Sequence, residues 1–94
     1  MPTGVYTKIT KTLIESPLRM WEVTTATVHK RLKLPPGSTF SGIPESTIYA
    51  SVKGSWIMIG WVDVPQPDGK LKRMDFTAAA DVFELSDLQI AERK

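Results

Sequence analysis

The chain has 94 residues, of which 41% are hydrophobic and 23% are charged, with a net charge of +2 and no cysteine. This length corresponds to a single β-rich domain spanning residues 1–94, with one modest core and little room for a deep catalytic cleft. The lack of cysteine excludes disulfides, thiol nucleophiles and zinc–thiolate sites, and it favours a cytoplasmic protein.

The N-terminal half contains two β-prone runs. Residues 5–14 are rich in threonine, isoleucine and valine, and Lys11 interrupts their alternation, which predicts an edge strand. Residues 20–34 form a longer run, in which the apolar parity changes around Thr24 and Thr25. Such a change predicts a β-bulge, which would let the strand bend around a barrel.

Residues 47–76 predict a three-stranded meander with turns at 53–55 and 65–69. A tight first turn places Ala50 opposite Ile57, and a six-residue second loop places Trp61 opposite Met74. A five-residue second loop would instead turn the third strand over. The predicted core face consists of Ile48, Ala50, Val52, Ile57, Ile59, Trp61, Met74 and Phe76. The predicted outer face consists of Tyr49, Ser51, Trp56, Met58, Gly60, Val62, Val64, Leu71, Arg73 and Asp75.

The C-terminal residues are expected to close the sheet and then form a helix. Residues 82–85 predict a short closing strand, and Ser86 followed by Gln89 fits a capping box for a short helix. The complete pattern resembles a small SH3-like barrel. The predicted fold is therefore mainly β: a small, partly open SH3-like or OB-like β-barrel of about five strands with a short C-terminal helix. The segment 54–61 is also similar to part of plasmid-type dihydrofolate reductase, but the Val-Gln-Ile-Tyr active-site motif of that family has no counterpart here.

No constellation of residues indicates catalysis, a metal site or a cofactor. The only histidine, His29, has no cysteine to join it in a metal site and lies toward the end of a β-prone run, so a surface position is expected. Asp63 and Asp75 fall on opposite faces of the predicted hairpin, which argues against a paired-carboxylate hydrolase. No apolar run approaches the ~20 residues that cross a bilayer, and residues 1–4 lack a signal peptide's basic start, so no membrane contact is expected.

Two surfaces remain as candidate binding sites. The predicted outer face brings together Tyr49, Trp56, Met58 and Arg73, which are residue types enriched at protein interfaces. A covering strand or helix that turned this face into a second core layer is the alternative.

The second candidate surface is basic. Residues 1–53 carry seven bases and three acids (+4), whereas residues 74–94 carry five acids and two bases (−3). The bases that a nucleic-acid backbone would contact are Lys30, Arg31, Lys33 and Lys53. A solvated strand edge is the other interpretation of this cluster.

The sequence therefore favours a non-catalytic binding module for another protein or for itself, as a protein-interaction or self-assembly domain. The first alternative is a nucleic-acid-binding barrel that uses the basic patch. The second alternative is an enzyme whose site is assembled between subunits.

Overall fold

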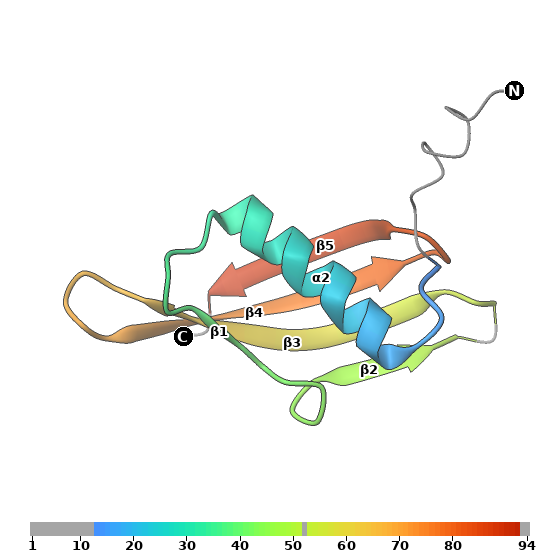
Figure 1. The fold of residues 1–94 in the computed structure, drawn as a ribbon, viewed down its shortest axis with the longest axis horizontal. Helices are drawn as coiled ribbons and strands as arrows, with labels where there is room; N and C mark the ends of the chain where they lie inside the picture. The colour runs from blue at the N-terminus through green and yellow to red at the C-terminus, as the bar shows by residue number, and fades with distance from the viewer. Residues whose placement is uncertain (1–12, 52, 93–94) are drawn as a thin grey trace, which may run out of the picture.

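The computed structural model describes residues 13–51 and 53–92, in which one helix lies across one face of an antiparallel sheet (Figure 1). The helix is α2 (Pro17–Leu32), and the strands are β1 (Thr39–Phe40), β2 (Thr47–Ala50), β3 (Trp56–Pro65), β4 (Leu71–Ala80) and β5 (Leu85–Glu92). The order across the sheet is β1-β3-β4-β5, and β2 pairs with the same strand, β3, as β1 does. The strands form an open sheet and not a closed barrel.

The chain is mainly β, as predicted, but the predicted strand at 20–34 is wrong because these residues form α2. Ser16 caps the helix by accepting a hydrogen bond from the Arg19 backbone N–H at 3.2 Å, and Pro17 occupies the first turn, where a missing N–H costs nothing. At the other end Lys33 takes a left-handed conformation with φ of 50°. The Ser16 cap therefore begins the helix, and the left-handed Lys33 ends it.

The buried face of α2 explains why a run rich in β-branched residues is helical. Met20, Thr24 and Val28 are spaced four residues apart and are fully buried against the sheet. The hydroxyls of Thr25 and Thr27 donate to main-chain carbonyls one turn earlier, each at 2.8 Å, so these polar groups are satisfied within the helix. Burial of one stripe therefore outweighs the low helix propensity of threonine and valine.

The three-stranded meander is present as β2, β3 and β4, but both predicted registers are wrong by one residue. Ile48 lies opposite Met58, and Val62 lies opposite Met74. The second loop has five residues (66–70), because Pro65 already pairs with Leu71. Since side chains alternate between the two faces of a sheet, a one-residue slip moves every residue of a strand to the opposite face.

The core consequently contains residues that were predicted to face outward. Met58 and Val62 are buried beneath α2 beside Phe76, which was correctly assigned to the core, whereas Ile59 is 46% exposed. Phe40 from β1 packs edge-on against Phe76, with ring centroids 6.1 Å apart. The partly buried Trp56 also packs against this core and not on the outer face.

The predicted C-terminal helix is wrong, because residues 85–92 pair with β4 as β5. Leu88 and Ile90 lie opposite Ala78 and Phe76, so their side chains extend the core, and this alternation favours a strand over a capping box. The predicted edge strand at 5–14 falls almost entirely outside the described residues. Among the residues that the structure describes, no helix combines the length and the apolar character needed to span a membrane.

Candidate functional site

The face of the sheet opposite α2 is the main candidate site, and we call it the open face. Among the described residues, 13–51 and 53–92, no helix, strand or loop covers this face. Along β3 it carries Ile57, Ile59 and Trp61, and β2 adds Tyr49, which is 50% exposed. Exposed faces of antiparallel sheets are usually polar, so this row of large apolar side chains is unusual for a face in water.

A stacked ion pair lies on the open face, near the hairpin that joins β3 and β4. The Arg73 guanidinium donates two hydrogen bonds to the Asp63 carboxylate, at 2.7 and 2.8 Å, and lies 3.7 Å from the centroid of the Trp61 ring. The hydrogen bond that Arg73 donates to Asp63 raises the pKa of Arg73 above its ordinary value, and the negative charges of Asp63 and Asp75 contribute further. The bidentate geometry and the stacking together hold the Trp61 ring in one orientation.

Ser41, which is 1% exposed, fixes the backbone of Trp61 through hydrogen bonds. The Trp61 backbone N–H donates to Ser41 Oγ at 3.1 Å, and Ser41 N–H donates to the Trp61 carbonyl at 2.8 Å. The Trp21 indole of α2 donates to the Ser41 carbonyl at 2.8 Å. One serine therefore connects the helix, the edge of the sheet and the strand that carries the open-face tryptophan.

A shallow depression of about 510 Å³ adjoins Trp61 on the open face. Its walls include Glu45 from the loop before β2, Ile59 and Trp61 from β3, and Asp75 and Thr77 from β4. Glu45 also accepts a hydrogen bond from the Gly42 backbone N–H at 2.9 Å, which holds its carboxylate at this rim. The depression therefore combines an aromatic ring, an aliphatic side chain and two carboxylates.

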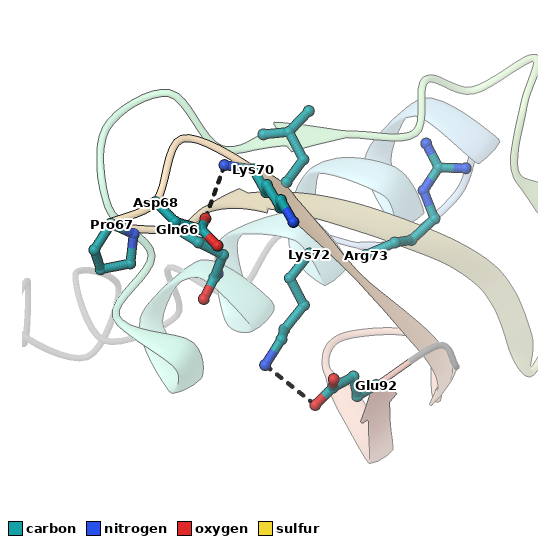
Figure 2. Close-up of a pocket in the computed structure, with 8 residues that line it drawn as sticks. Gln66, Pro67, Asp68, Lys70, Lys72, Arg73 and Glu92 are labelled. Atoms are coloured by element: carbon teal, nitrogen blue, oxygen red, sulfur yellow. Dashed lines mark hydrogen bonds and ion pairs between the residues drawn. The ribbon is translucent and has the colours of Figure 1, made fainter.

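A second basin, of about 590 Å³, lies beside the β3–β4 hairpin (Figure 2). Lys72 points toward Glu92, with which it forms an ion pair at 3.3 Å, while Arg73 extends away from both (Figure 2). Asp68 accepts a hydrogen bond from the Lys70 backbone N–H at 2.9 Å. Because acids accompany these bases, the basin is not a concentrated positive site for phosphate.

The predicted partner-binding residues do not form one surface. Tyr49 and Arg73 lie on the open face, as the prediction requires. Met58 is fully buried and Trp56 packs against the core, so these two residues lie on the face that α2 covers. The open face instead exposes Ile59 and half-exposes Trp61, both of which had been assigned to the core.

The predicted nucleic-acid residues are also divided. Lys30, Arg31 and Lys33 lie at the C-terminal end of α2, whereas Lys53 lies in the β2–β3 turn, near which the helix begins (Figure 1). The Arg31 guanidinium donates to the main-chain carbonyl of Leu88 in β5 at 2.9 Å. These four bases therefore do not form a single patch.

Within the described residues, no group of three or more histidine, aspartate or glutamate side chains is arranged to hold a metal ion. His29 is exposed in the last turn of α2, beside Lys30 and Arg31. Comparisons with protein-family models, with curated proteins and with solved structures find no match to this chain.

Proposed function

We propose that this protein is a non-catalytic protein-interaction domain that binds its partner through the open face. The single observation that carries the proposal is an apolar row on a sheet face that no described element covers, in which Tyr49 and Ile59 are exposed and Ile57 and Trp61 are half-buried. Covering such a row removes apolar area from water, which contributes about 25 cal/mol for each Å².

The fixed orientation of the Trp61 side chain supports the proposal further. Interfaces gain affinity when their anchor residues are held in the bound conformation before the partner arrives, since less side-chain entropy is then lost. Trp61 is held by the Arg73 stack on one side of the strand and by the Ser41 hydrogen bonds to its backbone. Tryptophan and arginine are also the residue types that dominate interface hot spots.

Site-specific photo-crosslinking tests the proposal directly. A benzophenone amino acid is introduced at Ile59 in the full chain, and separately at Leu18, which is 53% exposed in α2, on the other layer of the molecule. After irradiation in the cells that produce the protein, we expect discrete protein adducts from position 59 and few from position 18.

The Leu18 variant is the matched control because its side chain is also large, apolar and at least as exposed as Ile59. Equal adduct formation from both positions, or adducts from Leu18 alone, would refute the assignment of the partner to the open face. An Ile59→Asp substitution in the crosslinking chain with the benzophenone at Tyr49 provides a second test. We expect it to abolish the adducts, because a buried unpaired carboxylate opposes binding.

A further inference from the structure

The outer edge of β5 is a long strand edge with main-chain groups that face away from the sheet. β5 has eight residues and pairs only with β4 among the described residues. The Leu88 carbonyl accepts a hydrogen bond from Arg31 Nη1 at 2.9 Å, so it points away from β4. The N–H and C=O groups of one residue in an antiparallel strand point to the same side, and successive residues alternate. Those of Leu88 and Ile90 therefore face outward, whereas those of Gln89 face β4.

The C-terminal end of α2 extends over this edge. Figure 1 shows that α2 crosses β5 and that its C-terminal end lies beyond the strand, on the side away from β4. A groove of about 360 Å³ lies between the two elements, and we call it the β5 groove. Thr27 and Arg31 line it from the helix, and Leu85, Ser86, Asp87 and Leu88 line it from the strand. A strand that is added to β5 therefore runs beneath the last turns of α2.

The helix wall of the β5 groove is basic. Arg31 donates to the Leu88 carbonyl and forms no ion pair within the described part of the chain, so its guanidinium has further N–H donors for a ligand. Lys30 follows Thr27 by three residues and so neighbours it on the helix surface. Asp87 also lines the groove, but its side chain alternates onto the open face, where it accepts a hydrogen bond from Gln89 Nε2 at 3.4 Å. Because guanidinium groups bind carboxylates in bidentate pairs, this wall favours an acidic ligand.

We propose that the β5 groove binds an extended, acidic segment of another protein, which adds to the edge of β5 as a further strand and places a carboxylate at Arg31. Strand addition supplies affinity through main-chain hydrogen bonds, and the side chains of the groove supply specificity. The β5 groove is separate from the open face, so this inference goes beyond the proposed function and does not depend on it.

Two other occupants of the β5 groove meet an obstacle. Antiparallel pairing with β5 of a second copy would place both helices on the same side of the joined sheet, and each helix would extend over the other copy's strand (Figure 1). The two helix ends would then collide. Residues 1–12 of the same chain include Lys8 and Lys11 and no acid, so their charge has the same sign as that of Lys30 and Arg31. An acidic segment of a partner meets neither obstacle.

Hydrogen–deuterium exchange of single amides, measured by NMR on the full chain, tests the edge. In the free protein the Leu88 and Ile90 amides should exchange about tenfold faster than the Gln89 amide, which faces β4. A blocked eight-residue peptide of alternating glutamate and valine should slow exchange at Leu88 and Ile90 and leave Gln89 unchanged. Slow exchange at Leu88 and Ile90 before peptide is added would overturn the inference, because the edge would already be occupied. If that protection increased with protein concentration, the occupant would be a second copy.

Charge-neutral variants locate the carboxylate. Arg31→Gln should weaken the affinity of the glutamate–valine peptide by about fivefold and Lys30→Gln by about twofold, within the range for exposed ion pairs. Lys53→Gln makes the same change in net charge at an exposed position in the β2–β3 turn and should leave the affinity unchanged. A peptide of alternating lysine and valine should bind about tenfold more weakly than the glutamate–valine peptide. Equal binding of the two peptides, or equal weakening by Lys53→Gln, would overturn the inference.

Two N-methylated forms of the glutamate–valine peptide test main-chain recognition. Every second N–H of an added strand faces β5, so methylation at one residue type should abolish binding and methylation at the other should preserve it. Equal retention or equal loss in the two peptides would overturn strand addition. The Ile59 methyl signals serve as the internal control, because they report on the open face and should not shift. Shifts at Ile59 without protection of Leu88 would place the peptide on the open face and would also overturn the inference.

Discussion

Replacing Gly60 with alanine should destabilise the fold, because the added methyl group enters a space that is already filled. A Cβ atom at Gly60 would lie 2.7 Å from Ser41 Oγ and 3.0 Å from Phe76 Cζ. Neither neighbour moves freely. Ser41 Oγ is bonded to the Trp61 backbone N–H and to Ser46 Oγ, and the Phe76 ring is 1% exposed.

The magnitude follows from two contributions. Overpacking by one methyl group in a tight core costs about 1–3 kcal/mol. Displacing Ser41 Oγ from the Trp61 N–H adds about 1 kcal/mol for a weakened buried hydrogen bond. We therefore expect the free energy of unfolding to fall by about 2–4 kcal/mol in Gly60→Ala, and the melting temperature to fall on the order of 10 °C.

Urea unfolding followed by tryptophan fluorescence and by far-UV circular dichroism measures this free energy. The cycle with Ser41→Ala is the control, since removing Oγ relieves the closer of the two contacts. Gly60→Ala should then cost less in the Ser41→Ala background than in the natural chain. A neutral or stabilising effect of Gly60→Ala, as expected where a glycine only adds entropy to the unfolded state, would refute the packing described here.

Substitutions at three further positions test the ends of α2 and its contact with β5. Ser16→Ala should lower the free energy of unfolding by about 1 kcal/mol, because the Arg19 N–H loses its acceptor, and Ser16→Asp should restore the lost stability in thermal unfolding. Lys33→Gly should raise the melting temperature, because glycine avoids the cost of about 1–2 kcal/mol that an L-residue has in the left-handed conformation. Arg31→Met keeps the aliphatic stem but loses the hydrogen bond to the Leu88 carbonyl, so the backbone amides of β5 should exchange with deuterium about fivefold faster.

The sequence predicts the meander well but not the faces of its strands. The three strands and both turns lie where proline, glycine and alternation indicate. The face assignment depends on the register, and the pairing of Asp63 with Lys72 was as plausible from charge as the pairing with Arg73 that the structure has. Because Ile57 and Ile59 alternate with Met58 and Gly60, β3 lacks the alternation of apolar and polar residues that usually shows which face of a strand is buried.

The helix was predicted as a strand for a different reason. Threonine and valine favour strands locally, and only the four-residue spacing of Met20, Thr24 and Val28, together with Ser16-Pro17, indicates a helix. The error in register also changes the face on which some of the predicted binding residues lie. Tyr49 and Arg73 are on the open face as predicted. Trp56 and Met58 lie on the core side, because the register differs from the predicted one by one residue.

α2 covers the Met58 side of β3 and leaves the Ile59 side open, and two neighbouring substitutions test this arrangement most directly. Met58→Ala removes a fully buried side chain and should lower the free energy of unfolding by about 2–5 kcal/mol in urea titrations. Ile59→Ala removes a side chain that is 46% exposed and should cost about 1 kcal/mol or less. A larger loss for Ile59→Ala than for Met58→Ala would contradict the account, because it would place Ile59 in the core and Met58 on the open face.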